Sequence, residues 1–179
     1  MAPTGHDPEK CETVFRKIRL KLKSKGAMTV QSDLIAQATW RQNMRAIPPG
    51  AKGSFALVVA PEHLASRFKD AILPPVLATP IMVLVMENAA LNAIRDYLEP
   101  GESALGTVVD VRHLAATPVG QRVTAEAEVT HVEGRRIVFA VTARDEVEEI
   151  GRGTHERTVI DLRRLTQRLD AKAGRQRRD

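Results

Sequence analysis

The stretch "VLATPIMVLVMENAALNAIRDYLEPG", residues 76–101, constrains the fold more than any other part of the sequence. Thr79 is an N-cap residue type, and Pro80 fits the first turn, where its missing N–H costs nothing. A helix capped by Thr79 is therefore predicted to begin here and to end before Pro100. Residues 81–86 are apolar on every side, which predicts a helix surrounded by protein. Other elements must wrap around it.

The rest of the chain supplies strands that can cover such a helix. Residues 121–132 alternate strictly between apolar and polar side chains, as a half-buried strand does, and Gly134 marks a turn after them. Further strand-like segments are 54–60, 104–114, 137–145 and 149–162. The last four strands are predicted to form an antiparallel meander. A sheet around one central helix is the hotdog arrangement, an α+β fold.

Such a sheet leaves an edge strand and an open face, which predicts a homodimer formed through the sheet. Composition divides the chain into four parts: a basic helical N-terminal extension (1–46), a Pro/Gly linker "IPPGAKG" (47–53), the hotdog domain (54–162) and a basic tail (163–179).

The two ends of the chain are basic and the middle is acidic. Residues 1–46 carry nine Lys/Arg against four Asp/Glu, residues 163–179 carry seven against two, and the middle carries 11 against 16. Basic termini are most often solvated, but they can also contact a polyanion. The N-terminal part offers only Phe15 and Trp40 for base stacking, which argues against nucleic acid without excluding it.

Cysteine usage and hydropathy indicate a cytoplasmic protein without a membrane partner. The single cysteine, Cys11, excludes an internal disulfide framework and a cysteine-based metal site, and it fits a reducing compartment. The N-terminus shows no signal peptide. The apolar run 71–86 is interrupted by three prolines and is shorter than the ~20 residues that a membrane span needs.

Three polar side chains stand out from this pattern. Glu87 lies in the apolar helix, where a buried and unpaired carboxylate costs several kcal/mol. It follows Thr79 by eight residues, about 12 Å along the axis and on roughly the same side. His113 ends the strand 104–114, in phase with its valines. Each residue also has a purely structural interpretation: Thr79 as a helix cap, Glu87 as a glutamate that reaches solvent, and His113 as a histidine at a strand end. Spacing alone does not show that the three meet.

Longer motifs carry a family resemblance: "VLATPIMVLVMENA", "YLEPGESALGTVVDVRHLAATPVG" and "VEGRRIVFAVTARDEVEEIGRGTHERTVI". Over residues 53–162 the chain resembles the fluoroacetyl-CoA thioesterases, a hotdog family. The resemblance implies that Thr79, Glu87 and His113 form the catalytic centre. It also implies two substrate-binding positions, Gly106 beside the acyl group and the active-site arginine Arg157.

The implied chemistry is hydrolysis of an acyl-CoA thioester, for which no cofactor or metal is expected because CoA is part of the substrate. A glutamate in an apolar pocket becomes more basic and more nucleophilic. Glu87 could attack the thioester or activate water, and the sequence leaves both open. His113 would assist proton transfer, Thr79 would hold the carboxylate and thioester in register, and Gly106 would permit close backbone approach.

The chain departs from that family at the helix entrance. The fluoroacetate-specific member carries a phenylalanine in this lid, where the present chain has Ile72, Leu73 and prolines. With Leu73 in the substrate entrance, we expect a short or medium acyl-CoA substrate. Two alternatives remain open: an acyl-CoA-sensing regulator that uses the basic N-terminal helices, and a related hotdog activity such as a dehydratase.

Overall fold

The computed structural model describes residues 45–176, so nearly all of the predicted N-terminal extension, with Phe15 and Trp40, lies outside the described residues. The described helices and strands are β1 (Lys52–Val58), α3 (Ala65–Phe68), α4 (Thr79–Ile94), β2 (Glu102–His113), β3 (Arg122–Glu133), β4 (Arg136–Arg144), β5 (Glu149–Asp161) and α5 (Leu162–Gln176), with short 3-10 helices at Pro61–His63 and Arg95–Tyr97. β1 begins inside the segment 47–53, and Ile47 just before it is buried.

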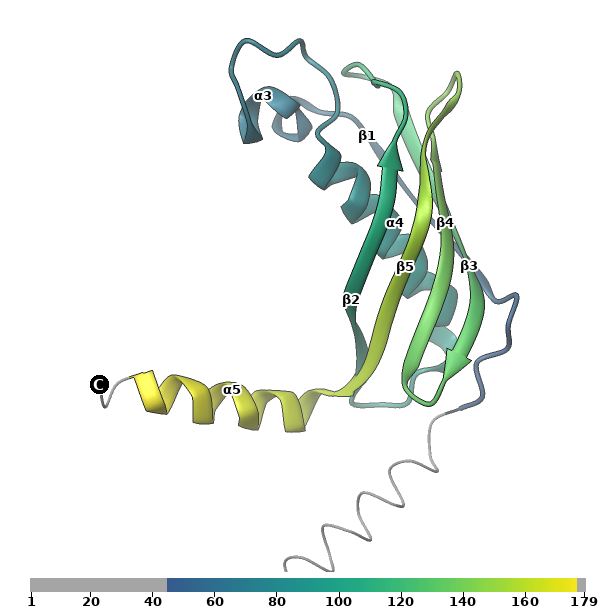
Figure 1. Cartoon of the computed structure of the whole chain (residues 1–179), viewed down its shortest axis with the longest axis vertical. Coiled ribbons are helices and arrows are strands. Elements are labelled where there is room, and N and C mark those ends of the chain that lie inside the picture. Colours follow the sequence, from purple (N-terminus) through teal and green to yellow (C-terminus); the bar gives the residue numbers. More distant parts are fainter. Residues whose placement is uncertain (1–44, 177–179) are drawn as a thin grey trace, which may run out of the picture. The chain divides into compact units, whose positions relative to one another are not determined.

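The five strands form one antiparallel sheet that curls around α4 (Figure 1), in the order β1-β3-β4-β5-β2. The predicted α+β architecture, an antiparallel sheet wrapped around one long central helix, is confirmed. The strict alternation of β3 explains why the sheet can do this. Its apolar residues face α4 and are buried, while Glu126 and Glu128 lie on the outer face.

The predicted four-strand meander is wrong in one respect, because β2 pairs with β5 and not with β3. The chain passes from the edge strand β2 to β3, which lies next to the other edge strand β1, through residues 114–121. This crossing is held by the backbone N–H of Leu77, which donates to Thr117 O (2.8 Å), and by the buried Thr117 hydroxyl, which donates to Asp145 (2.9 Å). Alternation identifies strands but carries no information on their neighbours. As a result β2 is an edge strand.

One face of α4 forms the core, with Met82, Val85, Met86, Ala89, Ala90, Ala93 and Ile94 buried. β1 crosses this face closely at Gly53, where a Cβ would overlap the backbone of Ala89 and Ala93. The opposite face remains open within the single chain, and Leu84 on it is 44% exposed. The prediction of a helix surrounded by protein therefore holds for only one side of α4.

The predicted N-cap role of Thr79 is also wrong. The N-cap residue of α4 is Ala78, which has an extended backbone, and no side chain caps the helix. Thr79 and Pro80 occupy the first two helical positions, where proline fits because its missing N–H would have no helical partner. The Thr79 hydroxyl is thus available for another contact.

After β5 the chain continues directly into α5, whose first turn is fixed by the Arg164 N–H donating to the Asp161 carboxylate (2.8 Å). α5 is strongly basic, in keeping with the composition of residues 163–179. Within residues 45–176, no helix combines the length and apolar character required to cross a bilayer.

Candidate active site

Thr79 and His113 meet at the end of the domain where α4 begins and β2 ends (Figure 1). The Thr79 hydroxyl lies 2.9 Å from His113 Nδ1. Burial lowers the pKa of His113 below its ordinary value because it penalises the imidazolium form. A neutral imidazole can accept the threonine proton at Nδ1 when that nitrogen is unprotonated, so the pair is suited to proton transfer.

Glu87 lies further along α4, against β2 at Gly106. A Cβ at Gly106 would overlap the Glu87 carboxylate oxygen Oε1 and would lie 3.0 Å from His155 Cε1. Arg157 Nη1 lies 3.8 Å from Glu87 Oε1, and the Glu87 side chain is 38% exposed. The structure thus brings Glu87, Gly106 and Arg157 together, with the carboxylate at the open face of α4.

Arg157 comes from β5 and is nearly fully buried. Its guanidinium donates through Nη2 to Ala104 O (2.5 Å) and through Nη1 to the backbone oxygen of Glu87 (3.3 Å). Burial lowers the pKa of Arg157, and the nearby Glu87 carboxylate opposes this shift. An arginine still remains a cation near neutral pH, so a fixed positive charge lies beside the only carboxylate of α4.

A β-bulge in β2 produces this arrangement. The pairing of β2 with β5 shifts register between Gly106 and Val108, so that Arg157 is opposite Gly106 and Glu156 is opposite Val108. Bulges re-aim side chains and bend a strand locally. Glycine at position 106 then allows the bent strand to approach the Glu87 carboxylate, which any side chain would displace.

His155 was not among the site residues predicted from the sequence. Its side chain is 1% exposed and stacks on Phe139, with ring centroids 6.1 Å apart. Nδ1 lies 2.8 Å from Val108 O, and Nε2 lies 3.2 Å from Arg157 Nη1 and 3.6 Å from Glu87 Oε1. The two-residue period of a strand could have revealed it. His155 precedes Arg157 by two residues, so the two side chains lie on the same face of β5.

The structure therefore places the predicted site residues in two groups within one chain. Thr79 contacts His113, and Glu87 contacts Gly106 and Arg157, but among the described residues no hydrogen bond or ion pair links Glu87 to either member of the first pair. Leu73 is 38% exposed in the segment before α4. In the described part of the chain, no three His, Cys, Asp or Glu side chains cluster as metal ligands would.

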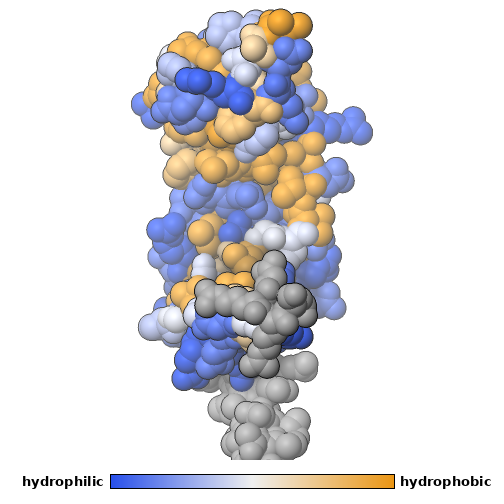
Figure 2. Space-filling model, turned by 90° about the vertical axis from the view of Figure 1, so that its left-hand side faces the viewer, coloured by the Kyte–Doolittle hydropathy of each residue, from blue (hydrophilic) through white to orange (hydrophobic). Residues whose placement is uncertain are grey.

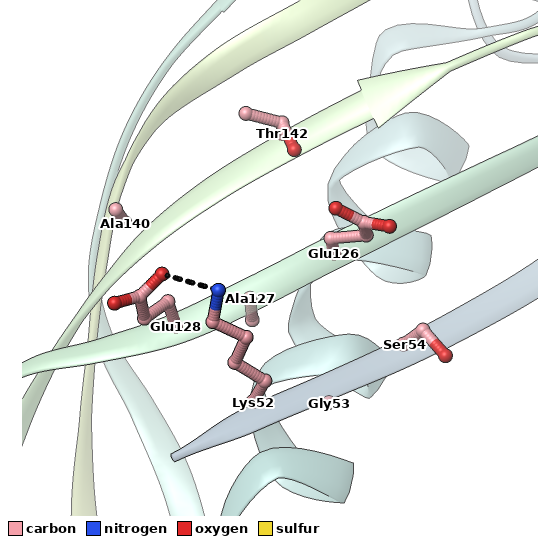
Figure 3. Close-up of a pocket in the computed structure, with 8 residues that line it drawn as sticks. All are labelled: Lys52, Gly53, Ser54, Glu126, Ala127, Glu128, Ala140 and Thr142. Carbon is pink, nitrogen blue, oxygen red and sulfur yellow. Dashed lines mark ion pairs between the residues drawn. The ribbon is translucent and has the colours of Figure 1, made fainter. Parts of the chain in front are cut away.

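A separate hollow of about 580 Å³ lies on the outer face of the sheet, over β1, β3 and β4 (Figure 3). The Lys52 ammonium and the Glu128 carboxylate pair across it at 3.2 Å. Its lining residues are Lys52, Gly53, Ser54, Glu126, Ala127, Glu128, Ala140 and Thr142. None of the candidate catalytic residues reaches this face, so the hollow is not part of the site.

Comparison with known proteins connects this geometry to a family. Residues 59–163 match the family described as fluoroacetyl-CoA-specific thioesterase. The fluoroacetyl-CoA thioesterase of Streptantibioticus cattleyicolor is 51% identical over 120 residues, which cover 64% of this chain and 86% of that protein.

Solved structures agree with the sequence match. A structure of the fluoroacetyl-CoA thioesterase FlK has a TM-score of 0.68 and 42% identity, over 71% of this chain and 98% of that one. A thioesterase superfamily member from Thermus thermophilus has a TM-score of 0.71 and 34% identity, over 76% of this chain and all of that one. By fold and sequence, this chain belongs to the fluoroacetyl-CoA-specific thioesterase family, within the hotdog fold.

Proposed function

We propose that this chain is an acyl-CoA thioesterase that hydrolyses a short or medium acyl-CoA thioester to the free acid and CoA. Membership of the family supports the reaction class, and related structures contain acetyl-CoA or fluoroacetate with CoA. The observation that carries the proposal is Glu87: the only acid of α4 presents its carboxylate, beside Gly106 and Arg157, at the open face of the helix.

We further propose that the working form is a homodimer joined through β2. This edge strand exposes Leu105, Val108 and Val109, each 45–47% accessible, and exposed apolar edge strands invite pairing with another chain. The open face of α4 adds Leu84. Figure 2, viewed from the side where β2 forms the sheet edge, shows apolar surface in patches over this face. A second copy paired along β2 would cover this edge strand.

Such a dimer would complete the active site. In an antiparallel β2–β2 pair with the two-fold axis at Val109, and with Thr107 taken up by the bulge, the partner's His113 lies opposite Ala104, two residues from Gly106 and on the same face of the strand. Gly106 touches Glu87. The partner's Thr79–His113 pair would therefore come close to Glu87, which neither member contacts within its own chain.

In this site Glu87 acts on the thioester carbonyl, either directly or through a water molecule. Direct attack breaks the C–S bond, releases CoA thiolate and leaves an acyl-glutamate anhydride that water then hydrolyses. In the other route Glu87 takes a proton from the attacking water. The Thr79–His113 pair supplies the proton that the thiolate takes up, and it regains a proton from the water that hydrolyses the anhydride or, in the other route, from protonated Glu87. Arg157 holds Glu87 in place, and Gly106 keeps the space beside the carboxylate open for the acyl group.

The entrance supports an aliphatic acyl group. Ile72 and Leu73 precede α4 and are 86% and 38% exposed. Two aliphatic side chains at this position provide an apolar contact for a short or medium chain without the aromatic ring found in the fluoroacetate-specific lid. We therefore propose butyryl- to octanoyl-CoA as better substrates than fluoroacetyl-CoA.

A panel of acyl-CoAs tests the proposal, with release of the CoA thiol as the readout. The wild-type protein should hydrolyse at least one member. The variants Glu87→Gln and His113→Ala should each lose about 10²-fold or more in kcat, as expected for removal of a group that transfers protons or attacks the substrate.

The matched control is Glu126→Gln, because Glu126 is an exposed glutamate on the outer face of the sheet. This variant should keep the wild-type rate. A wild-type protein that is inert on the whole panel would overturn the proposed activity, and so would a Glu87→Gln variant that is as active as the control.

A further inference from the structure

The hydrogen bonds of His155 determine which of its nitrogens carries the proton. The Val108 carbonyl can only accept, so Nδ1 must be protonated to make the 2.8 Å contact. The Arg157 guanidinium can only donate, so Nε2 must offer its lone pair across 3.2 Å. Both contacts are satisfied by one state, the neutral imidazole with its proton on Nδ1.

This neutral state has a consequence for Glu87. His155 Nε2 and Glu87 Oε1 are 3.6 Å apart, and two acceptors at this distance do not bond to each other. The Arg157 Nη1 group lies beside both of them, 3.2 Å from the imidazole Nε2 and 3.8 Å from the carboxylate Oε1. Arg157 is thereby fixed against Glu87, while the carboxylate itself is not drawn into the core by the histidine.

The histidine is itself rigidly placed. It is buried on the stacked ring of Phe139, and its Nδ1 bond ends on the β2 bulge, next to the Gly106 contact. His155 thus connects the bulge to the Arg157 guanidinium. A side chain that orients a reacting group in this way matters because a misplacement of about 1 Å can cost about 10²-fold in rate.

We propose that His155 is a positioning residue for the proposed hydrolysis: as a neutral imidazole protonated at Nδ1, it fixes Arg157 so that the Glu87 carboxylate stays at the open face beside Gly106. This role rests on the proposed thioesterase function. Burial and the Arg157 charge lower the pKa of His155, which agrees with a neutral ring.

Three substitutions separate the two hydrogen bonds. His155→Gln can place its amide oxygen near the position of Nε2 and accept from Arg157. His155→Asn can donate to Val108 O but is too short to reach Arg157. His155→Phe keeps the ring on Phe139 and makes neither bond. The expected result is a loss of about 10–100-fold in kcat for the Phe and Asn variants, with little change in KM and substantial recovery in the Gln variant.

A second readout does not depend on activity. In the wild-type protein labelled with ¹⁵N-histidine, the NMR signals of the His155 ring near neutral pH should show a protonated Nδ1 and an unprotonated Nε2. A protonated Nε2 would overturn the inference, and so would equal losses in all three variants or a Phe variant with wild-type kcat. If the wild-type protein is inert on acyl-CoAs, the proposed function fails, and this role fails with it. An active wild type with an unaffected Phe variant overturns the role of His155 alone.

Discussion

At the scale of single residues, the chemistry depends on how closely β2 approaches Glu87. Gly106 provides this approach, because a methyl group there would occupy the place of the carboxylate oxygen. The closest obstacle is the flexible end of a glutamate rather than backbone, so an alanine displaces mainly that side chain, while the His155 ring at 3.0 Å must give by only a few tenths of an ångström. Displacing a reacting group by about 1 Å can cost 10²-fold in rate.

We therefore expect Gly106→Ala to lose about 10–100-fold in kcat while its melting temperature stays near that of the wild type. Gly174→Ala is the matched control, because Gly174 lies in α5 with nothing within 4 Å of an added Cβ. The control should keep full activity and, as a helical glycine replaced by alanine, should not be destabilised. Full activity in Gly106→Ala would contradict the placement of the acyl group beside this glycine.

The buried His155 also makes stability depend on pH. Burial and Arg157 lower its pKa in the folded state, against smaller opposing effects of the Val108 backbone, Glu87 and Glu156. As the pH falls through about 6.5, the unfolded chain binds a proton at this position that the folded chain does not, so stability is lost on acidification.

The melting temperature should therefore fall between about pH 7.5 and about pH 5.5, and it should fall less steeply in His155→Gln. His113 has a pKa shifted in the same direction, so part of the slope should persist in the variant. Thermal unfolding followed by circular dichroism over this range measures both slopes. Identical slopes for the variant and the wild type would show that His155 is not held neutral by the fold.

At the scale of elements, local patterns could predict the strands and the central helix but not their full arrangement. The alternation of β3 and the proline in the first turn of α4 are local signals, and both were predicted correctly. The neighbour order of β2 depends on a crossing loop, and the role of the Thr79 hydroxyl depends on a residue 34 positions away. Long-range contacts of this kind leave no periodic trace in one sequence.

The packing of β1 on α4 gives a prediction at this scale. A Cβ at Gly53 would overlap the helix backbone at Ala89 and Ala93, which cannot move aside as a side chain can. Gly53→Ala should lower the free energy of unfolding by about 1–3 kcal/mol or more, as overpacking does. Urea denaturation against Gly174→Ala measures the difference. A variant as stable as this control would contradict the close crossing.

At the scale of the whole molecule, the features that a single chain leaves uncovered all lie on the side of α4 and β2. Residues 81–86 of α4 are apolar on all sides yet covered on only one, and β2 exposes apolar residues along the edge of the sheet. The two halves of the candidate site also fail to meet within one chain. The sequence predicted the residues of the site through family resemblance, but it could not show that Glu87 and His113 lie apart on one copy.

A charge at the proposed interface should separate the copies. We expect Val109→Lys to be monomeric in analytical ultracentrifugation and to lose most thioesterase activity, because an unpaired charge would be buried between two β2 strands. Val58→Lys is the control, since Val58 is an exposed valine (47%) near the end of β1, at the other sheet edge. A Val109→Lys dimer with full activity would place the interface elsewhere.

Complementation between two inactive variants tests the central claim most directly. Glu87→Gln and His113→Ala are co-expressed or unfolded and refolded together, and acyl-CoA hydrolysis is measured against each variant alone. If Glu87 works with the partner's His113, each mixed dimer has one intact site, and random mixing should restore about a quarter of the wild-type rate. A mixture no more active than its inactive parents, although mixed dimers have formed, would contradict a site shared between two copies.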